Sequence, residues 1–257
     1  MQLNNTKLVV ILLLGLMVIG FGVGGLMLAL NSEHLMHGKF SSNINSESSH
    51  HSLGERKIRE DEINLNKNIN SIKIVNSVGD VNIEYYDGND IKIVYNAYER
   101  SSLEVDKNTR EIKIEGKVDK RDKSLSGNIS NVELNIKVPA SYDNDFKIKN
   151  GVGTINCYLS SYQYLEIKNG VGDINIYTEN VGESFAKLGV GSLKFVIPKQ
   201  SELKVEAKTG VGSISNRFDF DYEDSNGKFI SDRLNASIGD DKVRVILEVG
   251  TGDIKIR

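Results

Sequence analysis

One short phrase occurs six times along the chain, and this repetition constrains the fold more than any other feature. The copies are Asn76–Ile83 (NSVGDVNI), Asn150–Cys157 (NGVGTINC), Asn169–Ile176 (NGVGDINI), Leu188–Phe195 (LGVGSLKF), Thr209–Ser215 (TGVGSIS) and Val249–Ile256 (VGTGDIKI). Counted at the second glycine, Gly153, Gly172, Gly191 and Gly212 follow at intervals of 19, 19 and 21 residues, and Gly252 comes 40 residues later. We interpret the last interval as two periods with one degenerate copy between them. A period of about 20 residues predicts stacked coils.

The glycines of the phrase mark predicted corners. In Phe146–Leu159 the inward positions are even-numbered up to Val152 and odd-numbered from Ile155, so the chain must bend between them. Gly153 is the residue best able to take the positive φ of such a bend. A short Asp, Ser or Thr follows each corner and can accept a hydrogen bond from a nearby amide. The predicted corner residues are Gly79, Asp80, Gly153, Thr154, Gly172, Asp173, Gly191, Ser192, Gly212, Ser213, Gly252 and Asp253. A calcium ladder is disfavoured, because its repeats recur every nine residues.

Alternating apolar and polar residues continue from Ile63 almost to Arg257 and predict an all-β domain. We expect a β-solenoid-like (parallel β-helix-type) stack of about ten coils, each about 20 residues long. Asp106–Asn108 lies between two alternating runs and predicts a hairpin. Whether the early strands, 63–138, join the stack or form an antiparallel layer stays open, as does the handedness. Lys255 and Arg257 are expected to guard an edge strand with charge.

The stack is expected to follow one transmembrane helix. Leu8–Leu30 is 23 residues long and carries no charge, which is enough to span a bilayer and too long for the apolar core of a signal peptide. Lys7 on one side and Glu33 on the other predict a cytoplasmic N-terminus, residues 1–7. Residues 31–62 then form a flexible extracytoplasmic stalk and residues 63–257 the β-repeat domain. A cleaved signal peptide is the alternative, and Gly20 and Gly24 leave helix-mediated homo-oligomers open.

Several kinds of chemistry are disfavoured. All four histidines, His34, His37, His50 and His51, fall in the stalk, so the domain cannot form a Ser-His-Asp or Cys-His site, and solvated histidines are favoured over a metal site. Cys157 is the single cysteine and is expected to be a small buried hydrophobe. The acidic run Asp219–Gly227 lacks the Gly and Glu of an EF-hand loop. We therefore predict no catalytic residue, no metal and no cofactor.

Charge gives no reason to expect nucleic acid. The formal net charge is −3, and no basic stripe is apparent in the linear sequence. The tyrosines gather at 85/86, 95/98 and 158/162/164, where covering strand edges is favoured over packing against sugar rings.

Val132–Pro139, followed by Phe146–Ile155, resembles the bacterial putative-adhesin family of β-strand-repeat proteins, also called toast-rack domains. Phe195–Pro198 with Leu203–Ile214 is similar to the same phrase, and the resemblance covers about residues 69–257. The run Asn235–Ile254 is also similar to the C-terminal β domain of membrane proteins that respond to cell-wall-active antibiotics. The resemblance implies an all-β domain outside a bacterial membrane, with no catalytic residues to carry over. The stalk and the single span depart from multi-span sensors.

Together these features predict a membrane-anchored extracytoplasmic β-repeat protein and not an enzyme. It is expected to be a binding or scaffold module at the cell envelope, with a cell-wall polymer or an envelope protein as partner and a role in adhesion or envelope stress. One alternative is a polysaccharide-acting β-helix enzyme that uses carboxylates within Asp219–Asp224. Another is a self-assembling spacer subunit.

Overall fold

The structure is a computed structural model that describes residues 56–98, 101–118, 132–198, 202–227, 231–240 and 242–257. All of them belong to one compact unit, 51–257. The predicted cytoplasmic segment, residues 1–7, the predicted span, residues 8–30, and most of the predicted stalk lie outside these ranges. In the part of the chain that the structure describes, no helix could serve as a membrane span.

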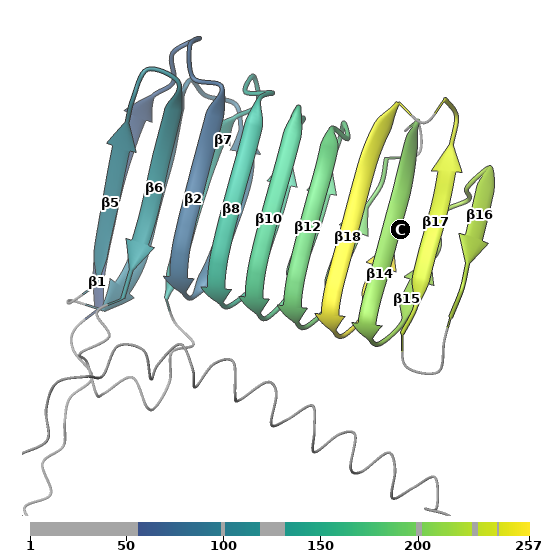
Figure 1. Cartoon of the computed structure of the whole chain (residues 1–257). Helices are drawn as coiled ribbons and strands as arrows, with labels where there is room; N and C mark the ends of the chain where they lie inside the picture. The colour runs from purple at the N-terminus through teal and green to yellow at the C-terminus, as the bar shows by residue number, and fades with distance from the viewer. Residues whose placement is uncertain (1–55, 99–100, 119–131, 199–201, 228–230, 241) are drawn as a thin grey trace, which may run out of the picture. The chain divides into compact units, whose positions relative to one another are not determined.

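The described residues form two large β-sheets and no helix, which confirms the all-β class (Figure 1). Sheet A has the order β1 (Arg56–Asn64), β4 (Asp90–Tyr98), β7 (Glu133–Pro139), β3 (Asp80–Tyr86), β9 (Ile155–Leu159), β11 (Ile174–Thr178), β13 (Leu193–Val196), β19 (Ile254–Ile256) and β15 (Ile214–Asn216). Sheet B has the order β16 (Tyr222–Ser225), β17 (Arg233–Ile238), β14 (Leu203–Val211), β18 (Val243–Thr251), β12 (Glu183–Val190), β10 (Tyr164–Val171), β8 (Asp145–Val152), β2 (Ser71–Val78), β6 (Glu111–Lys117) and β5 (Ser102–Lys107).

The apolar positions of both sheets meet in one core. Alternate residues of each strand are buried, as in β8, where Phe146 and Ile148 face inward while Lys147 and Lys149 face outward. Cys157 is fully buried in this core and unpaired, which confirms its predicted role as a small hydrophobe. Burial raises the pKa of its thiol well above the usual range, so it stays protonated. The polar positions are left for the two outer faces.

Rungs connect the sheets. A rung is a strand of sheet B, a glycine corner, and the next strand, in sheet A. Rungs β8–β9, β10–β11 and β12–β13 follow one another in the chain and pair in parallel register, so that Asn150, Asn169 and Leu188 occupy equivalent positions. The six corner glycines have φ between 109° and 140°, namely Gly79, Gly153, Gly172, Gly191, Gly212 and Gly252. They lie in register, and a Cβ on Gly172 would be 2.2 Å from the carbonyl oxygen of Gly153.

The order of the rungs departs from a simple coil. Rung β18–β19 lies between β12–β13 and β14–β15, although β14–β15 comes earlier in the chain. The interval between Gly212 and Gly252 holds no degenerate coil in the described residues. It contains β16 and β17, which pair antiparallel at the end of sheet B. Strand β19 pairs with both β13 and β15, so the prediction that Lys255 and Arg257 guard an edge strand is wrong.

The early strands show both arrangements that the sequence left open: some join the parallel stack, and others form antiparallel pairs. Strands β2 and β3 form a rung beside β8–β9, and β6 and β7 extend the two sheets in parallel beyond them. Strands β1, β4 and β5 are antiparallel additions at that end. The β5–β6 pair is the hairpin predicted at Asp106–Asn108. Because β1 begins at Arg56, residues 56–62 belong to a sheet and not to the predicted stalk.

Candidate binding faces

The corner residues are held by hydrogen bonds between rungs. Asp80 Oδ1 accepts from the Thr154 amide at 2.7 Å, and Asp173 Oδ1 from the Ser192 amide at 2.8 Å. Asp253 Oδ1 accepts from both the hydroxyl and the amide of Ser213, and these bonds lower the pKa of Asp253. Each carboxylate thus bridges its own rung to the next. Within the described ranges, no group of three His, Cys, Asp or Glu side chains could hold a metal ion.

A row of asparagines lines the inside of the corners, and its structural role was not predicted from sequence. Asn76, Asn150 and Asn169 are almost fully buried. Asn150 Nδ2 donates to the Gly79 carbonyl at 3.0 Å, and Asn169 Nδ2 to the Gly153 carbonyl at 2.8 Å. The amides satisfy carbonyl oxygens that the bend removes from the ladder, so these residues belong to the scaffold.

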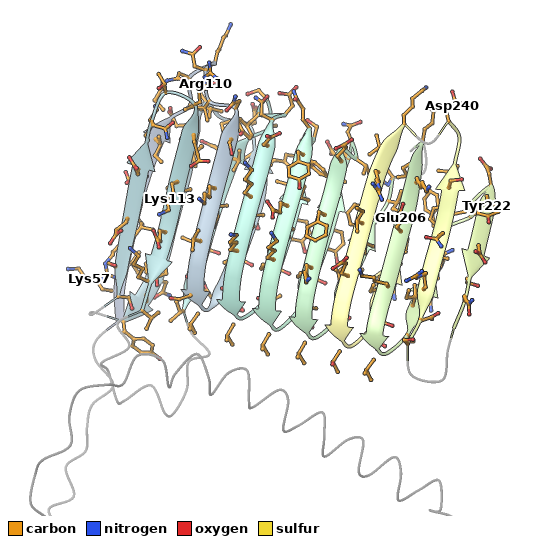
Figure 2. The ribbon with its side chains drawn as sticks, viewed as in Figure 1. Lys57, Arg110, Lys113, Glu206, Tyr222 and Asp240 are labelled. Carbon is orange, nitrogen blue, oxygen red and sulfur yellow. The ribbon has the colours of Figure 1, made fainter. Side chains whose placement is uncertain are left out.

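One row of valines projects outward from the same corners. Val152, Val171 and Val190 are 46%, 48% and 49% exposed and lie side by side in register. The prediction that Val152 faces inward is therefore wrong, because inward alternation ends two residues earlier, at Asn150. The glycines on either side leave each valine as the side chain at the tip of its corner. In Figure 2 this edge carries an evenly spaced row of side chains.

The outer face of sheet A carries two ladders of uncharged side chains. Asn135, Asn82, Asn156 and Asn175 form a chain of side-chain hydrogen bonds of 2.8–2.9 Å across four adjacent strands. Tyr158 and Tyr177 stack nearly parallel, with ring centroids 4.7 Å apart. The Lys194 ammonium lies 4.7 Å from the centroid of the Tyr177 ring. The Tyr177 ring thus has internal partners, and a sugar ring would have to displace one of them.

The other tyrosines highlighted by the sequence are dispersed. Tyr95 and Tyr162 are buried, and burial raises the pKa of both hydroxyl groups. Tyr85 donates to Glu179 at 2.8 Å. These positions form no single aromatic platform.

The outer face of sheet B, turned toward the viewer in Figure 2, carries two rows of lysines. Lys113, Lys73 and Lys147 form one row across β6, β2 and β8. Lys149, Lys168 and Lys187 form the adjacent row across β8, β10 and β12. We call these six residues the lysine stripe. The absence of a basic stripe in the linear sequence was the reason for excluding nucleic acid, and the folded domain does carry such a stripe. The sequence does not reveal it, because its lysines are distributed over residues 73–187.

A shallow groove of about 340 Å³ adjoins the stripe farther along the same face. Phe185 and Ile246 contribute apolar surface, and charged side chains from β18, β14 and β17 surround them. These charges are largely paired, with Arg244 3.0 Å from Glu206 and Lys208 2.6 Å from Glu248. Figure 2 labels Glu206, which lies on β14 within the groove. The groove is therefore less basic than the stripe.

The acidic segment is an edge of the domain. Residues 221–227 are exposed, and Tyr222–Ser225 forms the edge strand β16. Asp221 Oδ2 accepts from the Gly239 amide at 2.9 Å, and Glu223 Oε2 from the Asn216 side chain at 2.9 Å. Neither carboxylate lines the groove, so the residues proposed for an enzyme lie apart from the concave surface described above.

Comparison with known proteins supports the fold. No protein-family model and no curated protein matches the chain. A solved structure of a putative cell adhesion protein from Clostridium sporogenes is 20% identical, with a TM-score of 0.55, over 78% of this chain and 99% of that one. A putative adhesin from Bacteroides fragilis is 13% identical, with a TM-score of 0.33, over 79% of this chain and 97% of that one. The Clostridium sporogenes structure confirms the fold that the resemblance to bacterial putative adhesins implies.

Proposed function

We propose that this chain is a membrane-anchored extracytoplasmic β-repeat protein that acts as a binding and scaffold module at the cell envelope. Residues 8–30 are the proposed anchor, with the N-terminus in the cytoplasm, and the solenoid-like stack is displayed outside. The partner is a cell-wall polymer or an envelope protein, and the role is in adhesion or envelope stress. The module has no enzymatic activity of its own.

The outer face of sheet B carries this proposal. Ten strands present a continuous surface whose backbone groups are paired with neighbours except at the two edges, so the face interacts through its side chains. Three lysines of the stripe, Lys73, Lys147 and Lys149, give that face positive charge that no ion pair within the described residues neutralises. A broad, open face suits a large partner better than a small enclosed substrate.

Crosslinking in intact cells tests the proposal. A photo-crosslinking residue at Val75, which shares a row with Lys149 on the outer face of sheet B, should capture wall material or an envelope protein. The matched position is Ser215 on β15, which is exposed at the end of sheet A. Capture from Val75 and not from Ser215 is the expected result. If neither position yields a partner, the chain is not a binding module under those conditions and the proposal is withdrawn.

The proposed location has its own test. Cys157 is buried and stays protonated, so it should not react with a bulky maleimide in the folded domain. A Ser215→Cys variant therefore adds one reactive thiol. Labelling of that variant in intact cells by a membrane-impermeant maleimide is expected, and labelling only after lysis would place the domain in the cytoplasm.

A further inference from the structure

The lysine stripe carries more positive charge than its surroundings neutralise. Lys113 pairs with Glu115 at 2.6 Å, Lys168 pairs with Glu166, and Lys187 lies 3.4 Å from Glu248. Lys73, Lys147 and Lys149 form no ion pair with any residue that the structure describes. These three side chains are neighbours, since Lys73 lies opposite Lys147, and Lys149 is two residues farther along β8.

This arrangement opposes stability. Like charges at opposed positions of neighbouring strands repel each other, and each such pair destabilises a sheet by a few tenths of a kcal/mol or more. Lys73–Lys147, Lys73–Lys113 and Lys149–Lys168 are all opposed pairs of this kind. Folding gains no ion pair from Lys73, Lys147 and Lys149, whereas a bound anion would turn the repulsion among them into attraction.

The stripe is long and narrow. It crosses five adjacent strands, β6, β2, β8, β10 and β12, which spans about 19 Å at ~4.8 Å per strand. It is only two rows wide, or about 7 Å. Toward the loop ends of the strands it is bordered by the acidic residues Glu111, Asp145 and Glu183. Toward the corners it is bordered by glycines and the exposed valines.

These borders select the shape of the partner. A flat anionic surface, such as a membrane, would press against the acidic row as well as the lysines. A thin chain lying across the strands would avoid that acidic row, and the two carboxylates within the rows of the stripe, Glu115 and Glu166, are already paired with Lys113 and Lys168. The lysines of each row repeat at the strand spacing, which suits a polymer with charges at regular intervals.

We propose that the lysine stripe binds a linear polyanion that carries an anionic group on each repeat unit and lies along the stack axis. The inference rests on the proposed function and specifies the partner as a polymer. Nucleic acid is the less favoured polyanion, because sequence-tolerant binding of single strands relies on aromatic side chains for base stacking. Two aromatic side chains lie on this face beside the stripe, Tyr164 on β10 and Phe185 on β12, and the Lys168 ammonium lies 5.7 Å from the centroid of the Phe185 ring.

The test uses the full chain in a neutral detergent and measures binding of linear inorganic polyphosphate, with orthophosphate, polyglutamate, single-stranded DNA and uncharged dextran in parallel. The first variant is Lys73→Gln/Lys147→Gln/Lys149→Gln. Its control, Lys92→Gln/Lys137→Gln/Lys255→Gln, removes the same charge from the outer face of sheet A. We expect polyphosphate to bind, added salt to weaken binding, and the first variant to lose about ten-fold or more in affinity while the control changes less than about two-fold.

The thermal unfolding midpoint of each variant shows whether a loss of binding comes from a folding defect. The first variant should be at least as stable as the parent, because it removes repulsion. Polyglutamate binding as tightly as polyphosphate would support a linear polyanion without a requirement for phosphate, while tighter DNA binding would overturn the choice of polymer. The proposal that the stripe binds a polyanion would be overturned by equal losses of polyphosphate affinity in the two variants, by the absence of polyphosphate binding, or by orthophosphate binding as tightly as polyphosphate. Crosslinking from Val75 to an envelope protein would then leave the proposed function standing without this inference.

Discussion

At the scale of single residues, each corner depends on a glycine for two separate reasons. Gly172 has φ of 124°, and a side chain there would also collide with the carbonyl oxygen of Gly153. We predict that Gly172→Ala lowers the free energy of unfolding by at least about 2 kcal/mol. Urea denaturation measures this free energy. Gly227→Ala is the control, because a Cβ at Gly227 meets nothing closer than 3.4 Å. Similar losses in both variants would contradict the prediction.

Buried and half-exposed asparagines should differ in energetic importance. Asn150→Leu removes two buried hydrogen bonds, the one from Asn150 Nδ2 to the Gly79 carbonyl and the one from the Asn76 amide to Asn150 Oδ1, and should cost about 2 kcal/mol because both lie in the core. Asn156→Leu removes two similar bonds from the outer ladder, but water can replace them there, so we expect about 1 kcal/mol or less. The same denaturation experiment measures both. A larger effect at Asn156 would show that the outer ladder, and not the corner, holds the rungs together.

Asp253 should make the domain sensitive to acid. Hydrogen bonds from Ser213, aided by Lys255, lower its folded pKa below the ordinary value of 3.8. A depressed pKa contributes stability that is present above the unfolded value and is lost as the pH falls through the folded value. We predict that Asp253→Asn is less stable than the parent at pH 7 and that the difference shrinks below about pH 4. Denaturation midpoints of the parent and the variant from pH 7 to pH 2 measure this difference in stability. A difference that stays constant with pH would show that the Asp253 carboxylate is not the source of the acid sensitivity.

At the scale of elements, rung β18–β19 connects rung β12–β13 to rung β14–β15. Strands β12 and β14 do not pair with each other, and both pair with β18. We predict that a chain ending at Asp240 loses amide protection in β14 and β15 while β8–β11 stay protected. Hydrogen exchange followed by mass spectrometry measures this. Retained protection of β14 would mean that it can dock on β12 directly.

The corners, the buried faces and the β5–β6 hairpin could be predicted from the sequence because each follows from local alternation and backbone geometry. The rung order could not. The inward residues of β12, β18 and β14 are all small or apolar, so Ala186, Leu247 and Ala207 give no preference for one neighbour over another. Val152 was misassigned for a related reason, because alternation does not show where a strand leaves the core.

At the scale of the whole molecule, the ends of the stack decide whether copies associate. Sheet A ends at β1, whose residues Glu60, Asp61 and Glu62 place three acids on an edge. Charge on an edge strand opposes pairing with another chain. We predict that replacing these three acids with threonine produces oligomers in sedimentation velocity. The control replaces Asp87, Asp143 and Asp240, which are exposed and lie outside strands, and should leave the parent distribution unchanged.

The lysine stripe belongs to this scale as well. Its residues come from five strands, and each strand contributes only one or two of them. No segment of the sequence is strongly basic, so the charge emerges only when the rungs are stacked in register. The expectation of a large binding face followed from the repeat, whereas the location of the charge required the structure.

The position of rung β18–β19 has a consequence for biogenesis. Residues 243–257 fill a gap between strands that are synthesised earlier, so the stack cannot be completed until that segment has left the ribosome. If the domain is exported, it crosses the membrane before it can finish folding. During that interval the open flank of β12 is accessible to chaperones and quality-control proteases, which makes late maturation part of how this protein is built.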